Sequence, residues 1–164
     1  MTLHSSAADS RQTTLFARVP PKIRGRVISI GEEYWRSHCV DDRLPARADI
    51  DPLDIPLLLP QIILLDVERD PWNFRFRLIG TNIVHHLSKD WTGTWMSEIG
   101  HMAPPSTIFS ACVQVASSGE PLRSDTPYTG PNQNYVCAED IILPLAADGE
   151  TPNMLLVFVE HHSR

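Results

Sequence analysis

From Phe74 to Ile99 the chain reads FRFRLIGTNIVHHLSKDWTGTWMSEI. Its first residues alternate strictly between apolar and basic side chains, which predicts a half-buried strand because successive side chains of an extended chain point to opposite faces. On this pattern the apolar face carries Phe74, Phe76 and Leu78, and the opposite face carries Arg75 and Arg77. Surface ion pairs are the expected role of the two arginines, with Glu32 and Glu33 of the first helix as candidate acids, and contact with a partner protein is the alternative.

The rest of the stretch predicts short helices. Gly80 and Thr81 break the alternation, and residues 82–88 form a helical pattern with Ile83 and Leu87 on one face. Residues 90–93 are typical of a turn, and residues 94–99 have the length of one more helical turn. A strand that leads into short, aromatic-rich helices indicates a sheet whose concave face is covered by short helices around a pocket.

The remaining elements follow from hydrophobic periodicity and turn residues. Residues 27–39 predict an amphipathic helix, and residues 61–67 predict a strand buried on both faces that forms a hairpin with the strand beginning at Phe74. Residues 105–118 predict the best helix of the chain, with Gly119 as its C-terminal cap. Asp51 is expected to cap a short helix that begins at Pro52. The predicted later strands are residues 121–128 (an edge), 135–145 and 154–161.

Several phrases of the chain resemble the PAS domain, and more closely the family of short bacterial proteins that consist of one PAS domain. They are LPARADIDPLDIP (44–56), LPQIILLDV (59–67), FRFRLIGT (74–81), DWTG (90–93) and ILPL (142–145), and the resemblance spans roughly residues 30–162. It implies an α+β fold: a PAS-like five-stranded antiparallel sheet with short helices over one face and an additional N-terminal helix. In such proteins that helix packs on the outer face of the sheet or forms a dimer.

The resemblance and the composition together suggest the organisation of the chain. We expect a flexible basic tail over residues 1–22, an N-terminal helix and connecting segment over residues 23–60, and a PAS-like sensor core over residues 61–162. The apolar fraction of 42% and charged fraction of 21% are typical of a globular protein. No apolar run reaches membrane-spanning length, and residues 1–14 lack the apolar core of a signal peptide, so we expect a cytoplasmic protein.

The charge of the chain is unevenly distributed. Residues 1–30 hold five Arg or Lys and one Asp, whereas the rest holds nine basic and nineteen acidic residues, for a net charge of −6. A basic arm on an acidic body suggests nucleic acid or an acidic protein as a distant alternative partner. The arm has no interleaved aromatic residues and no reading motif, which favours an ordinary solvated tail.

The sequence offers no catalytic constellation and no metal site. It contains none of the motifs G-x-S-x-G, H-E-x-x-H, G-x-x-x-x-G-K and G-x-G-x-x-G, so we expect a protein that is not an enzyme. Cys39, Cys112 and Cys137 are far apart, and buried free thiols in a reducing compartment are the expectation. The histidine pairs 85–86 and 161–162 each point in two directions, so neither pair forms a bidentate site easily.

Two cofactors are weighed and disfavoured. His85, His86 and His101 lie where the helical wall of a PAS pocket is expected, and imidazole is the usual haem ligand. The helix over residues 105–118, where haem-binding PAS domains commonly place that ligand, contains no histidine. A photochemical flavin needs a reactive cysteine in the short helices, and residues 80–100 contain none. The cofactor therefore stays unknown.

The expected pocket is apolar and lies between the sheet and the short helices. Its candidate ligand-binding residues are Phe76, Leu78, Ile83, Leu87, Trp91, Trp95, Phe109 and Val113. We expect both tryptophans to face the hollow, although an aromatic stripe is more often plain core than a ligand cage.

Two functions remain open. The first is a stand-alone sensory or adaptor domain that binds an unknown small apolar or amphipathic molecule and signals to an unknown protein. The second is a constitutive interaction or dimerisation adaptor whose core is filled by its own side chains. In either case we expect a homodimer through the N-terminal helix or the outer sheet face, and no membrane partner.

Overall fold

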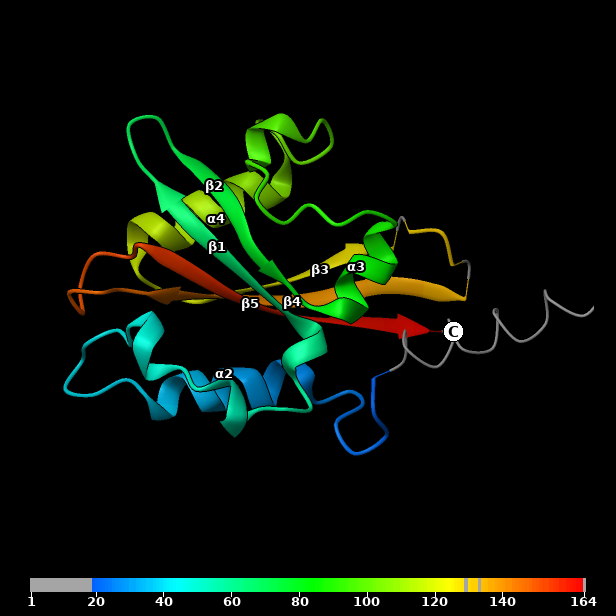
Figure 1. Cartoon of the computed structure of the whole chain (residues 1–164), viewed down its shortest axis with the longest axis horizontal. Coiled ribbons are helices and arrows are strands. Elements are labelled where there is room, and N and C mark those ends of the chain that lie inside the picture. Colours follow the sequence, from blue (N-terminus) through cyan, green and yellow to red (C-terminus); the bar gives the residue numbers. More distant parts are fainter. Residues whose placement is uncertain (1–18, 129, 133, 164) are drawn as a thin grey trace, which may run out of the picture.

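The structure is a computed structural model that describes residues 19–128, 130–132 and 134–163. A five-stranded antiparallel sheet in the order β2-β1-β5-β4-β3 has helices on both faces (Figure 1). The strands are β1 (Ile62–Glu68), β2 (Asn73–Ile79), β3 (Leu122–Pro127), β4 (Tyr135–Leu145) and β5 (Met154–Ser163). The helices are α2 (Val27–Ser37), α3 (Thr81–Leu87) and α4 (Thr107–Ser118), with single 3₁₀ turns η1 (Arg47–Asp49), η2 (Pro52–Asp54), η3 (Leu59–Gln61) and η4 (Met96–Glu98). The predicted PAS-like α+β architecture is confirmed.

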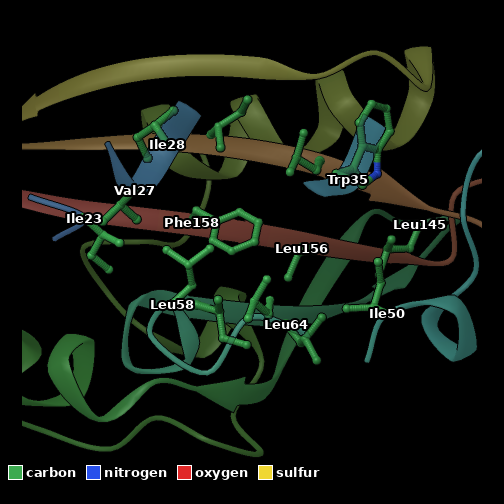
Figure 2. Packing of buried hydrophobic residues seen from close by; sticks show 14 of the residues in the cluster. Ile23, Val27, Ile28, Trp35, Ile50, Leu58, Leu64, Leu145, Leu156 and Phe158 are labelled. Carbon is green, nitrogen blue, oxygen red and sulfur yellow. The ribbon is translucent and has the colours of Figure 1, made fainter. Parts of the chain in front are cut away.

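Helix α2 and the segment that follows it cover the outer face of the sheet. Their buried side chains meet those of β1, β4 and β5 in what we call the outer cluster (Figure 2). The helix lies close to the strands because Gly31 has no side chain: a Cβ there would stand 2.5 Å from the ring of Phe158. The indole of Trp35 donates a hydrogen bond of 2.8 Å to the carbonyl of Pro144. Labelled members of the outer cluster are Ile23, Val27, Ile28, Trp35, Ile50, Leu58, Leu64, Leu145, Leu156 and Phe158.

The chain between β2 and β3 covers the inner face with α3, η4 and α4 (Figure 1). Their buried residues and the inward side chains of the strands form the inner cluster. Helix α4 begins where the hydroxyl of Ser106 accepts a hydrogen bond from the backbone N–H of Phe109, and it ends at Gly119 with a φ of 72°. Glycine adopts this left-handed conformation without a steric cost, as the sequence predicted for the C-terminal cap. The inner cluster contains Leu65, Phe74, Phe76, Ile79, Ile83, Met96, Ile99, Phe109, Cys112, Val115, Ala116, Ile142, Leu155, Val157 and Val159.

The alternation expected in β2 is broken by a bulge. Phe76 lies opposite Leu65, but the next paired residue, Leu78, lies opposite Leu64, so Arg77 is an extra residue in the strand. Leu64 belongs to the outer cluster and Leu65 to the inner cluster, and Leu78 therefore lies on the outer side. The prediction that Phe76 and Leu78 share one face was wrong.

The two arginines of β2 form surface ion pairs, as expected, but their partner is not one of the acids suggested on the first helix. Arg75 and Arg77 both pair with Asp66 on the neighbouring strand, at 3.1 and 3.0 Å. Glu32 pairs with Arg36 at 2.9 Å and with Arg123 of β3. Burial raises the pKa of the Glu32 carboxyl, but hydrogen bonds from Arg123 and Arg36 outweigh it and lower this pKa below its usual value.

Predictions from the sequence also concerned the basic tail, the Asp51 cap, the cysteines and membrane-spanning segments. Most of the predicted basic tail, residues 1–22, precedes the described residues. Asp51 caps η2 as predicted, because its carboxylate accepts a hydrogen bond of 2.9 Å from the N–H of Leu53. All three cysteines are free, but only Cys112 is buried. None of the helices in the described part of the chain combines the length and apolar character needed to cross a membrane.

Candidate functional site

An inner cavity of about 220 Å³ lies between the inner face of the sheet, α3 and the segment that follows β3. The sheet supplies its floor, since the inward side chains of β1, β2, β4 and β5 alternate with those of the outer cluster. Apolar side chains dominate its wall, and polar groups gather towards one end. The lining residues are Ile63, Leu65, Phe76, Ile83, His86, Leu87, Met96, Met102, Ile108, Thr126, Pro127, Tyr128, Gly130, Ala138, Val157, Val159 and His161.

The structure places three of the predicted pocket residues together in this lining. Phe76 comes from the floor, and Ile83 and Leu87 come from successive turns of α3. Their convergence follows from the strand period of two and the helix spacing of four that the sequence displays.

The other predicted pocket residues lie elsewhere. Leu78 faces the outer side because of the bulge. On α4, Phe109 packs edge-on against Phe74 with ring centres 5.3 Å apart, and Val113 packs at the margin of the inner cluster. Neither α4 residue lines the cavity.

The two tryptophans do not form a wall of the cavity. Trp91 packs partly against the inner cluster, and the amine of Lys89 lies 4.2 Å from the centre of its ring. Trp95 lies beside the edge of β2, where the guanidinium of Arg75 stands 5.6 Å from its ring centre. Neither tryptophan lines the inner cavity, so other residues supply its aromatic groups.

The polar end of the cavity belongs to a group of aromatic side chains from distant parts of the sequence, of which His86, Tyr128 and His161 line the cavity. The rings of His86 on α3 and His161 on β5 stack with centres 3.7 Å apart and planes at 25°. The hydroxyl of Tyr128 lies 2.9 Å from Nδ1 of His86. Tyr135 packs against His86 from the start of β4, with ring centres 4.6 Å apart. We call these four residues the His–Tyr cluster.

The imidazole of His161 is held in its neutral form. Burial, together with the nearby His86 and His162, lowers its pKa from 6.5 to about 3. Its Nδ1 atom is buried and has no hydrogen-bond partner among the described residues. A buried polar atom without a partner costs about 1–3 kcal/mol, and such an atom beside a cavity is a natural contact for a ligand.

Sequence reasoning placed His86 near the pocket wall but missed His161 and Tyr128. The available signal was the period of two along β5: Val157, Val159 and His161 point to the inner side, whereas Phe158 and Glu160 point to the outer side. Residues 161 and 162 were interpreted as a histidine pair, and the alternation along β5, which places only His161 on the inner side, was not applied to them. The structure instead pairs one histidine from each doublet.

A second hollow, of about 370 Å³ and mainly polar, adjoins the first at His161. Glu160 is buried in its wall and accepts hydrogen bonds from the backbone N–H groups of Gly25 and Val27, at 2.5 and 3.0 Å. His162 lies 3.0 Å from the carboxylate of Glu139. His161 is the residue that lines both hollows.

An apolar groove of about 330 Å³ lies on the outer side, between β1, β2 and the segment over residues 47–60. Leu78 lines this groove, as do Ile50, Leu64 and Leu156. Leu53 follows the lining residue Pro52 and is 84% exposed, so its side chain projects into solvent next to the groove.

Two buried titratable groups, Asp140 on β4 and Cys112 on α4, lie outside the cavity lining. Burial raises the pKa of Asp140 to about 6, against the lowering effect of the hydroxyl of Ser124, which donates a hydrogen bond of 2.8 Å. Burial also raises the pKa of the Cys112 thiol to about 12. The thiolate is the nucleophilic form, so Cys112 is an inert core residue at neutral pH.

The residues described in the structure contain no group of three or more His, Cys, Asp or Glu side chains placed to hold a metal ion. The expected wall histidines His85 and His101 are absent from the cavity lining, and His86 is present. The arrangement offers recognition chemistry: an apolar chamber with hydrogen-bonding groups at one end.

Comparison with known proteins gives one family. The family model described as "PAS domain" matches residues 28–159, which is more than half of the chain. A comparison with curated proteins finds no match.

Proposed function

We propose that this chain, which belongs to the PAS domain family, is a sensor that binds a small molecule in its inner cavity and signals through protein–protein contacts. PAS domains are sensory or interaction domains and are typically not enzymes. Ligand binding changes the output of such a domain only if the ligand prefers one of two conformations.

The observation that carries this proposal is the open volume inside the domain. Protein interiors are packed with few voids larger than a water molecule. A recess of about 220 Å³ that is lined mainly by apolar side chains, with the buried Nδ1 of His161 lacking a hydrogen-bond partner among the described residues, suits a largely apolar occupant that displaces water. The alternative of an adaptor with a self-filled core is less well supported, because its side chains leave this volume unfilled.

Two measurements test the proposal. Native mass spectrometry of freshly purified protein detects a retained molecule, and thermal shift with p-cresol, indole, naphthalene and benzoate detects binding of small probes. In the variant Ala138→Leu the larger side chain fills part of the cavity, so we expect loss of both signals. Ala111→Leu is the matched control, because Ala111 packs beside the inner cluster without lining the cavity.

The expected result is a retained mass or a rise in melting temperature in the wild type and in Ala111→Leu, and neither in Ala138→Leu. A ligand-free mass, together with no thermal shift for any of the four probes, would overturn the proposal and favour the adaptor.

A second candidate function, self-association, is favoured by the outer groove. In a two-fold dimer the same surface of both copies meets, so a projecting group and a recess on one surface can fill each other. Leu53 is such a projecting group, and the groove beside it is such a recess. The solvent side of α2 carries Ser29, Glu33 and Arg36, which gives less support to a dimer through that helix.

Light scattering over a range of protein concentrations tests the dimer. We expect Leu53→Asp to shift the protein towards the monomer, because a carboxylate cannot enter an apolar recess without a large desolvation cost. Leu57→Asp, at another exposed leucine that does not line the groove, is the control. A monomeric wild type at all concentrations excludes this candidate.

A further inference from the structure

The inner cavity has a lining that carries no permanent charge. Among the described residues of the lining there is no Asp, Glu, Lys or Arg, and the titratable side chains among them are His86, His161 and Tyr128. His161 is neutral at physiological pH because its pKa is about 3. An ion that enters such a recess loses part of its hydration and gains no opposite charge from the lining, so its binding is disfavoured relative to an uncharged molecule of the same size.

The polar end of the cavity has a limited capacity for hydrogen bonds. The hydroxyl of Tyr128 is already engaged with Nδ1 of His86 at 2.9 Å. Nδ1 of His161 is buried and has no partner among the described residues. A ligand that places one hydrogen-bonding group at the imidazole of His161 satisfies this nitrogen. The other polar side chain of the described lining is Thr126, which is exposed to solvent, so further polar groups of a ligand would face mainly apolar wall.

The volume of the cavity limits the size of its occupant. Benzene occupies an engineered cavity of about 150 Å³, so about 220 Å³ corresponds to roughly nine non-hydrogen atoms. Pockets for drug-sized ligands are larger, at about 300–1,000 Å³. The occupant is therefore a small molecule of one ring, or two fused rings.

We infer that the inner cavity selects an uncharged small molecule that carries one hydrogen-bonding group, and that His161 binds this group. The inference rests on the proposed function, because it names the class of ligand for the same cavity. Phenols, small alcohols and indole-like molecules belong to this class, whereas carboxylates and amines are excluded from it.

Three probes of nearly equal size test the inference. In 4-ethylphenol the polar group is an uncharged hydroxyl, 4-ethyltoluene is its apolar counterpart, and 4-methylbenzoate carries a charge. Dissociation constants are measured with the full-length protein by titration calorimetry or by NMR chemical-shift titration. We expect 4-ethylphenol to bind at least tenfold more tightly than 4-ethyltoluene, and 4-methylbenzoate to cause no shift at the cavity.

The variant His161→Phe separates a specific role of His161 from a general effect on the cavity. Phenylalanine keeps a ring next to His86 but has no nitrogen, so we expect the preference for 4-ethylphenol over 4-ethyltoluene to fall to about twofold or less. His101→Phe is the control, because His101 is exposed and does not line the cavity. It should retain the wild-type preference. The dispersion of the NMR spectrum shows whether each variant is folded.

The outcomes distinguish the inference from the proposed function. Binding of 4-methylbenzoate within threefold of 4-ethylphenol, or an unchanged preference in His161→Phe, overturns the inference and leaves the sensor proposal standing. If no probe binds and no molecule is retained during purification, both fail. If a molecule is retained from the cell, its charge decides: an uncharged molecule supports the inference, and an ionic molecule overturns it.

Discussion

The carboxylate of Glu160, near the end of β5, accepts a hydrogen bond of 3.0 Å from the backbone N–H of Val27, the first residue of α2. Glu160 is buried, and it also binds the N–H of Gly25. Helix α2 has no acidic residue in its first turn, and no side chain at its N-cap accepts a hydrogen bond. A residue 133 positions away in sequence therefore caps this helix.

We expect Glu160→Gln to destabilise the fold by about 1–2 kcal/mol, because the amide loses a charge-assisted hydrogen bond and the favourable interaction with the helix dipole. Urea unfolding measures the loss, and hydrogen exchange at the amide of Val27 reports on its location. Glu33→Gln, on the exposed side of α2, should change stability by less than about 0.5 kcal/mol. Equal effects of the two variants would contradict the capping role.

Gly31→Ala is expected to lower stability even though alanine favours helices. The new Cβ would stand 2.5 Å from the ring of Phe158, so α2 must move away from the sheet. Overpacking of this kind costs about 1–3 kcal/mol, which exceeds the gain of about 0.5–1 kcal/mol from helix propensity. Thermal unfolding measures the balance, with Ser29→Ala on the exposed side as the control. A more stable Gly31→Ala variant would show that the contact is loose.

Asp140 gives the stability of the protein a specific pH dependence. Its folded pKa of about 6 lies above the ordinary value of 3.8, so the folded state binds its proton more tightly than the unfolded chain. The contribution of this group to stability is favourable at low pH and is lost as pH rises from about 4 through 6.

We therefore expect Asp140→Asn to stabilise the protein at pH 7.5, on the order of 2 kcal/mol, and to have little effect at pH 4. Urea unfolding of variant and wild type across this range measures the difference. Glu68→Gln, at an exposed acidic residue of β1 that is not among the charges acting on Asp140, is the control. A difference between Asp140→Asn and wild type that does not vary with pH would refute the burial argument.

His161 contributes in the opposite direction over much of the same range. Its folded pKa of about 3 lies below the unfolded value of 6.5, so acid protonates the unfolded chain first and stability is lost as pH falls from about 6.5. We expect His161→Phe to remove this loss, and its stability relative to wild type to rise on the order of 1–2 kcal/mol from pH 7 to pH 4. Denaturant titrations at several pH values test this, with His101→Phe as the control. An unchanged difference would mean that the imidazole of His161 is accessible to protons.

The fold was predictable because its signals are local. Gly119 predicts the end of α4, Asp51 predicts the start of η2, and uninterrupted apolar runs predict β1 and β5. The resemblance to PAS domains then supplied the order of the strands, which periodicity alone does not give. The bulge at Arg77 has no glycine or other local mark, and a strand with one extra residue reads as regular in sequence.

The candidate site was predictable only where a single element defines it. Ile83 and Leu87 reach the cavity because they lie one turn apart on α3. The His–Tyr cluster joins residues of α3, the segment after β3, β4 and β5. The pairing of β4 with β5, in which Ala138 lies opposite His161, and the packing of α3 on the sheet bring these residues together. Trp91 and Trp95 were predicted to line the pocket because they are large aromatic residues four positions apart. In the structure each ring instead lies next to a cationic side chain, Lys89 for Trp91 and Arg75 for Trp95.

The bulge in β2 has a consequence for how relatives of this protein can be compared. Since Phe76 already faces inward and Leu78 outward, deleting Arg77 leaves a regular strand with every neighbour on its present side. Deleting a residue elsewhere in the strand instead reverses the faces of all residues beyond it. Position 77 is thus a natural place for a gap when this chain is aligned with a relative whose strand is regular. Without the gap, the outward-facing Leu78 would be aligned with an inward-facing residue of that relative.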